Sequence, residues 1–155
     1  MTAPTLTLLV LSDAHFDSAR TAGGKLAGLN PSLGAELAAR AWHDATRRHG
    51  HIDAILLCGD IIHAGNATPE ADYATFRDTL DLWTQRTPIL ATPGNCDITP
   101  AFFAAFNAPG LHTLGGYRFF VFADAYPDGP ADCIRTEEAL AEFARVAGES
   151  DAPLV

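Results

Sequence analysis

Three short apolar runs, each ending in a polar cluster, dominate the first two thirds of the chain. They span residues 6–11, 52–57 and 88–92. Runs of this length, with β-branched members and no polar alternation, are typical of strands covered on both faces, as in a parallel sheet. We therefore expect three buried β-strands with right-handed connections between them.

Helical periodicity fills both gaps between these runs. The first helix is expected to begin near Pro31, after Asn30, and to end before Gly50. Its apolar positions are Leu33, Leu37, Ala41 and Ala45. The second helix opens at Thr68 and carries an aromatic stripe that is predicted to be core: Tyr73, Phe76, Leu80 and Trp83. Strands alternating with helices indicate an α/β fold.

The pattern changes after residue 98. A short helix is expected from Thr99 to Phe106, and a hairpin from 111–114 and 117–123 around Gly115-Gly116. A turn at 128–130 precedes a helix capped by Thr136, whose inner face should carry Leu140, Phe143 and Ala147. Residues 151–155 resemble the beginning of another strand. We expect one domain over residues 1–155, with its C-terminal portion missing.

Composition and charge narrow the classes of partner. The 155 residues are 48% apolar and 19% charged, which is ordinary for a globular domain. The net charge of −9 argues against binding duplex nucleic acid, which depends on Lys and Arg. No apolar run approaches the ~18 residues of a membrane helix, so no membrane association is expected. The first residues carry no basic charge, and a cytoplasmic location is expected.

The three cysteines do not form a recognisable framework. Cys58, Cys96 and Cys133 are odd in number and include no Cys-x-x-Cys pair, which disfavours disulfides and a structural zinc site. Cys58 ends an apolar run and is interpreted as a small buried hydrophobic residue.

Polar clusters follow all three predicted strands. They are Ser12-Asp13-Ala14-His15, Gly59-Asp60-Ile61-Ile62-His63 and Gly94-Asn95-Cys96-Asp97. In open α/β sheets, ligands bind at the carboxyl ends of the strands. Carboxylate, imidazole and amide groups are metal ligands in proteins. Each cluster alone would be interpreted as a turn, but the ordered set of three favours a shared metal site.

This series of Asp-x-His, Gly-Asp and Gly-Asn-Cys-Asp resembles the calcineurin-like metallophosphoesterases. The resemblance implies the N-terminal part of a four-layer α/β/β/α sandwich with two divalent metal ions, such as Mn, Fe or Zn. It implies Asp13, His15, Asp60 and Asn95 as metal ligands, with Asp60 bridging the two ions. It further implies hydrolysis of a phosphate ester by water held between the metals.

The catalytic candidates are Asn95, Cys96, Asp97 and His63. Many family members have His in the position of Cys96, and a thiol is a poorer acid–base partner. A subgroup of small phosphodiesterases also has Gly-Asn-Cys-Asp, so activity is compatible with this change. The change favours a substrate with a good leaving group or an acid supplied elsewhere. His63 is interpreted as an outer residue of the site or as structural. Arg20, within the expected active-site loop 16–30, either contacts phosphate or is solvated.

Three functions compete at this stage. The first is a metal-dependent phosphodiesterase acting on a phosphorylated small molecule. Because the family supplies further histidines beyond the position of Val155, this hypothesis expects a complementing chain or oligomer. The second is an inactive remnant that serves as an interaction module. The third, a nucleotide-binding domain, is weak because no Gly-x-Gly-x-x-Gly follows any of the strands.

Overall fold

A three-stranded parallel sheet forms the centre of the molecule. The computed structural model describes residues 5–19, 30–126 and 133–155. The strands are β1 (Leu8–Leu11), β2 (Ala54–Cys58) and β3 (Ile89–Thr92), in the order β1-β2-β3. The register pairs Leu9 with Ile55 and Ile55 with Ile89. The predicted α/β class is confirmed, and all three strand ends lie at one edge of the sheet.

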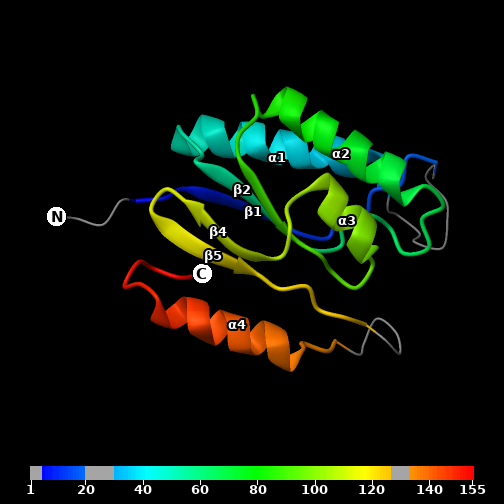
Figure 1. The fold of residues 1–155 in the computed structure, drawn as a ribbon. Coiled ribbons are helices and arrows are strands. Elements are labelled where there is room, and N and C mark those ends of the chain that lie inside the picture. The colour runs from blue at the N-terminus through cyan, green and yellow to red at the C-terminus, as the bar shows by residue number, and fades with distance from the viewer. Residues whose placement is uncertain (1–4, 20–29, 127–132) are drawn as a thin grey trace.

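Two helices lie side by side on one face of this sheet (Figure 1). α1 (Gly34–His49) follows a 3-10 turn at Pro31–Leu33, and α2 (Pro69–Trp83) leads towards β3. The short α3 (Thr99–Ala105) follows β3. Tyr73, Phe76 and Leu80 of α2 are fully buried, as their spacing predicts.

The apolar stripes of the two long helices are only partly buried. α1 buries Ala35, Ala38 and Ala39, whereas Leu37 is 57% exposed. Small alanines let the helix lie close to its neighbours, and this rotates the predicted leucine stripe outward. Trp83, at the last turn of α2, is 58% exposed, so its predicted core position is wrong.

A β-hairpin and a fourth helix form the second part of the chain. β4 (Gly110–Leu114) pairs antiparallel with β5 (Tyr117–Val121). Gly115 and Gly116 both have positive φ, which is the signature of the two-residue turn predicted there. α4 (Glu137–Gly148) begins at Thr136, whose hydroxyl accepts a hydrogen bond from the Ala139 amide. The hairpin and the capped helix are confirmed.

Aromatic contacts join α4 to the hairpin. The ring of Phe143 lies 5.5 Å from the rings of both Phe120 and Phe122. Leu140 is 48% exposed and Val146 is buried instead, so the inner face of α4 is turned from the predicted one. These contacts place α4 on the outer side of the hairpin (Figure 1).

The last residues return to β5 and are held by a buried arginine. The Arg118 amide donates to the Pro153 carbonyl, and the Val155 amide donates to the Arg118 carbonyl. The Arg118 guanidinium donates to three further carbonyls: Val146, Ser150 and Ala152. The strand-like pairing expected for residues 151–155 is therefore confirmed.

The hairpin lies over the face of the parallel sheet that α1 and α2 do not cover. A cavity of about 240 Å³ between the two sheets is lined by residues of β2, β3 and β5. Cys58, at the end of β2, lines this cavity and is exposed, so its predicted burial is wrong. The elements thus stack as helices, parallel sheet, hairpin and α4 (Figure 1).

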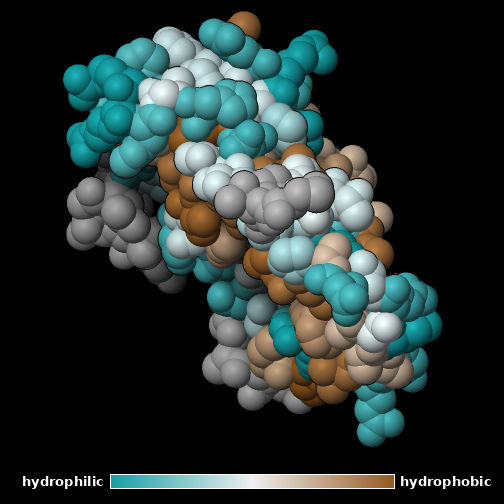
Figure 2. Space-filling model, turned by 90° about the vertical axis from the view of Figure 1, so that its left-hand side faces the viewer, coloured by the Kyte–Doolittle hydropathy of each residue, from teal (hydrophilic) through white to brown (hydrophobic). Residues whose placement is uncertain are grey.

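Hydrophobic residues reach the surface between the helical layer and the hairpin, as Figure 2 shows. Val10, on the outermost strand β1, is 57% exposed. Among the described residues, every helix is too short or too polar to cross a membrane.

Candidate metal centre

Each strand of the parallel sheet is followed by a loop that carries predicted site residues. The loops are 12–15 after β1, 59–63 after β2 and 93–97 after β3. The first two continue the pairing of their strands, because the Asp13 amide donates to the Gly59 carbonyl and the His15 amide to the Asp60 carbonyl. This pairing brings Asp13 and His15 alongside Asp60.

The backbone is strained at all three of these residues. Asp13, His15 and Asp60 have φ of 57°, 44° and 53°, a region that non-glycine residues rarely adopt. Such a conformation costs about 1–3 kcal/mol per residue, and it persists where surrounding contacts impose it, often at functional sites. It also allows Asp13 and His15, two positions apart, to project their side chains into one region.

Two glycines permit the close approach of the second and third loops. A Cβ on Gly94 would lie 2.2 Å from Asp60 Oδ1, and a Cβ on Gly59 would lie 2.8 Å from Gly94 Cα. Gly59 also has a φ of 83°. At this contact the Cys96 amide donates to Asp60 Oδ1 at 3.0 Å. The glycines of both motifs are therefore required by packing of backbone against backbone.

His15 lies at the spacing of metal ligands from two carboxylates, those of Asp13 and Asp60. His15 Nε2 lies 3.7 Å from Asp13 Oδ1 and 3.8 Å from Asp60 Oδ2. These distances are too long for hydrogen bonds. Two ligands bonded at about 2.1 Å to one tetrahedral ion lie about 3.4 Å apart, which is close to the separations seen.

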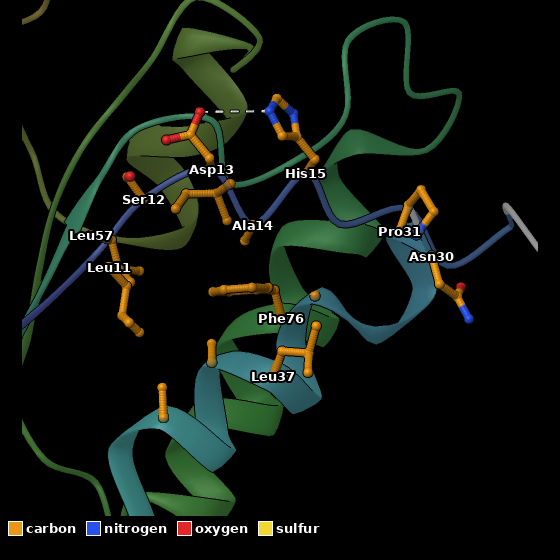
Figure 3. Close-up of a pocket in the computed structure, with 14 residues that line it drawn as sticks. Leu11, Ser12, Asp13, Ala14, His15, Asn30, Pro31, Leu37, Leu57 and Phe76 are labelled. Carbon is orange, nitrogen blue, oxygen red and sulfur yellow. Dashed lines mark ion pairs between the residues drawn. The ribbon is translucent and has the colours of Figure 1, made fainter. Parts of the chain in front are cut away.

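The surroundings of His15 also fit a metal ligand. His15 Nδ1 is buried and has no hydrogen-bond partner among the described residues. Figure 3 shows the side chains of Asp13 and His15 directed towards each other, on the opposite side of their loop from an apolar cavity. That cavity has a volume of about 280 Å³. Asp13 and His15 also line this cavity, whereas Asp60 and Cys96 do not.

Cys96, together with His15 and Asp60, forms the group of donors that are mutually close among the described residues. Its Sγ, a His15 ring nitrogen and an Asp60 oxygen all lie within 4.8 Å of one another. Burial, together with the neighbouring Asp60, raises the pKa of the Cys96 thiol to about 11. Asn95 is exposed, and its Nδ2 donates to Cys96 Sγ at 3.6 Å. The loop after β3 therefore places Asn95 and Cys96 at the border of the site.

Asp97 connects the second and third loops. Its carboxylate accepts hydrogen bonds from the amides of Ile61, Ile62 and Gly94, and from the Tyr73 hydroxyl. Burial raises the pKa of Asp97, although these donors oppose the shift. The contacts describe a residue that organises loops, and its predicted catalytic role stays a prediction.

His63 lies beside the donor set. Its ring is 5.8 Å from the ring of His15, in an edge-to-face arrangement. Both interpretations of His63, as an outer residue of the site and as structural, stay predictions. Arg20 and the turn predicted at 128–130 lie outside the described residues.

Asp72 is a residue of this region that sequence reasoning missed. It lies in the first turn of α2, immediately before Tyr73, and is 1% exposed. Its carboxylate accepts a hydrogen bond from Asn66 Nδ2, in the segment after β2. The signal in the sequence is that Asp72 stands next to the aromatic stripe of the helix. A carboxylate at such a position is expected to be buried, and a buried carboxylate needs hydrogen-bond donors from other segments.

The comparison with protein families follows the same motifs. A family model for calcineurin-like phosphoesterases matches residues 6–147. The chain belongs to the calcineurin-like phosphoesterase family. The resemblance identified from the three motifs is thereby confirmed.

A solved structure extends this comparison to the fold. The chain is similar to a dimetal phosphatase from Danio rerio, with a TM-score of 0.53 and 13% sequence identity. The match covers 91% of this chain and 51% of the phosphatase, so the chain spans about half the length of that protein. At this identity the likeness shows the fold alone. No curated protein matches the chain significantly.

Proposed function

We propose that this member of the calcineurin-like phosphoesterase family contributes the metal-binding loops of a metal-dependent phosphodiesterase. The observation that carries the proposal is that donor atoms of His15, Asp60 and Cys96 lie within 4.8 Å of one another, while Asp13 Oδ1 lies 3.7 Å from His15 Nε2. The backbones of Asp13, His15 and Asp60 are strained. The stack of helices, parallel sheet, hairpin and α4 supports assignment to the N-terminal part of a four-layer α/β/β/α sandwich.

The donor set suits divalent Mn, Fe or Zn. Asp13, His15 and Asp60 would hold one cation, and Asp60 and Asn95 would hold a second, with Asp60 shared. When bound, such cations supply Lewis acidity, which offsets phosphate charge and lowers the pKa of water. Four protein ligands for two cations leave coordination positions open, so we infer that a further segment or a second chain adds ligands.

The chain's own residues restrict the substrate. Cys96 stands where a histidine would protonate the leaving group, and a thiol is a weak hydrogen-bond donor. A phosphodiester whose leaving group departs without protonation, such as an aryl diester, suits this arrangement. The net charge of −9 favours a small phosphorylated molecule over duplex nucleic acid. We infer a cytoplasmic location.

Hydrolysis of bis(p-nitrophenyl) phosphate tests the proposal. The full chain with Mn²⁺ should release p-nitrophenolate, and a chelator should abolish the release. Asp60→Asn should remove activity, because it weakens the shared ligand, whereas Asp78→Asn, exposed on α2, should not. No turnover with Mn, Fe or Zn, even after addition of the complementing half of a related chain, would sink the enzyme hypothesis.

The alternative function is an inactive remnant that acts as an interaction module. Two observations favour it: Asn95 is exposed, and apolar residues such as Val10 and Leu37 reach the surface. Metal analysis separates the two hypotheses. The enzyme should take up about two equivalents of metal in its complete assembly, as binuclear hydrolases do, and the remnant at most about one.

A further inference from the structure

The N-terminal end of α2 contacts the chain segments that continue the three ligand-bearing loops: Ser18 after the first, Asn66 after the second, and Asp97 at the end of the third. Two consecutive residues, Asp72 and Tyr73, make these contacts through polar atoms. Both are buried, with exposed fractions of 1% and 0%. The hydrogen bonds of the two residues run to different loops, so each can be examined separately.

Asp72 joins the loop after β1 to the loop after β2. Its carboxylate accepts from the Ser18 hydroxyl at 2.5 Å, from the Ser18 amide at 3.2 Å and from Asn66 Nδ2 at 2.7 Å. Ser18 follows His15 by three residues, and Asn66 follows His63 by three. The buried charge is stabilised by these donors and by the N-terminal end of the α2 dipole.

Tyr73 ties α2 to the segment after β3. Its hydroxyl donates to Asp97 Oδ1 at 2.9 Å and accepts from the Ile98 amide at 3.0 Å. The same Asp97 carboxylate accepts from the amides of Ile61 and Ile62. The Asp97 carboxylate therefore links the Asn95 loop to the Asp60 loop, and the Tyr73 hydroxyl holds that carboxylate from α2.

We propose that Asp72 and Tyr73 are positioning residues that hold the three loops in the arrangement required for cation binding. The inference rests on the proposed function, because it takes Asp13, His15 and Asp60 as the ligands. Within the described part of the chain, neither positioning residue hydrogen-bonds to these donor atoms. The backbones of Asp13, His15 and Asp60 are strained and keep their conformation only where the surroundings impose it. Asp72 and Tyr73 act by preventing these backbones from relaxing.

Two near-isosteric variants test this role. Asp72→Asn can place an NH₂ group at the position of Oδ2, which now accepts from the Ser18 amide and from Asn66 Nδ2. Tyr73→Phe removes only the hydroxyl. Each should weaken Mn²⁺ binding by about 10–100-fold, the usual effect of losing an outer-shell partner. In the metal-free chain, Asp72→Asn should also accelerate amide hydrogen exchange in residues 12–18 and 59–66, and Tyr73→Phe should accelerate it in residues 93–98. Calorimetric titration and exchange mass spectrometry provide the two readouts.

Two controls on the same helix separate positioning from general stability. Asp78→Asn removes an exposed carboxylate and should change neither readout. Leu80→Ala removes a fully buried side chain distant from the loops, so it should lower the melting temperature. Its Mn²⁺ affinity should stay within about twofold, because distant sites act independently.

The possible outcomes are decisive in both directions. Unchanged affinity and unchanged loop exchange in Asp72→Asn and Tyr73→Phe would overturn the proposal, as would equal losses in Leu80→Ala. If the unmodified chain takes up no Mn²⁺, the proposed function fails for this chain. The exchange data on the metal-free protein then still accept or reject the positioning role by themselves.

Discussion

The ligand loops and the hairpin–α4 unit are built by different means. The loops of residues 12–15, 59–63 and 93–97 are held by hydrogen bonds between backbones and carboxylates, around three residues with positive φ. The hairpin and α4 are held by the Phe120–Phe122–Phe143 cluster and by the guanidinium of Arg118. Directional bonds can maintain a strained arrangement of donors, whereas aromatic packing tolerates local adjustment. The comparison predicts that stability and metal affinity respond to different substitutions.

The largest expected effect is on stability, from Arg118→Met. The change removes the guanidinium that donates to the carbonyls of Val146, Ser150 and Ala152, of which Val146 keeps a bond from the Glu149 amide. The free energy of unfolding should fall by about 3–4 kcal/mol. Denaturant unfolding measures this, with Arg145→Met, exposed on α4, as the control. If Mn²⁺ affinity falls as far as stability, the two regions are not independent.

Gly94→Ala should have the largest effect on the loops. The added methyl group would meet Asp60 Oδ1 at 2.2 Å and the Asp60 amide nitrogen at 2.5 Å. Mn²⁺ affinity should fall by about 100-fold, as for lost outer-shell order, when measured by calorimetry. Gly148→Ala, with open space around the new methyl group, is the matched control. Retention of full affinity in Gly94→Ala would contradict the glycine contact.

A smaller loss is expected from Phe143→Ala. The ring contacts Phe120 and Phe122 but is only half-buried, so unfolding should become easier by about 2 kcal/mol, below the range for a fully buried Phe. The loops should keep their Mn²⁺ affinity. Thermal unfolding measures the stability and calorimetry measures the Mn²⁺ affinity of the same preparation. A loss of both stability and affinity would show that the two regions are not independent.

The smallest effect is expected from Trp83→Ser. Trp83 is 58% exposed, although its spacing places it with Phe76 and Leu80. Stability should change by less than about 1 kcal/mol, as for other surface substitutions. Phe76→Ala, on the same helix but fully buried, should lower it by about 3–5 kcal/mol. Equal losses in the two variants would restore the sequence-based core assignment.

Local patterns predicted most elements of the fold. The apolar runs became β1, β2 and β3, and Gly115-Gly116 formed the hairpin turn, because period and turn chemistry are encoded by neighbouring residues. The buried faces were predicted less well. α1 packs through alanines, which carry little hydrophobic signal, and Leu37 lies outward. Which stripe of a helix is covered depends on distant elements.

In the candidate site too, features that follow from local patterns were predictable from the sequence, and other contacts between distant segments were not. The meeting of Asp13, His15 and Asp60 follows from parallel strands whose carboxyl ends share one edge. The contact between Asp72 and Ser18 joins positions far apart in the chain. No periodicity signals such a pair. The proximity of Cys96 Sγ to His15 likewise depends on how closely two loops approach.

The glycine-to-glycine contact between the second and third loops fixes the geometry of the site through residues other than those that offer ligand atoms. Gly59 and Gly94 determine how closely the two loops approach, yet neither has a side chain that could bind a metal ion. The side chains of the neighbouring Asn95 and Cys96 offer ligand atoms, and only the backbone amide of Cys96 takes part in this contact. An engineer can therefore exchange hard for soft ligands at these two positions and alter ion preference, while the architecture that presents them stays intact.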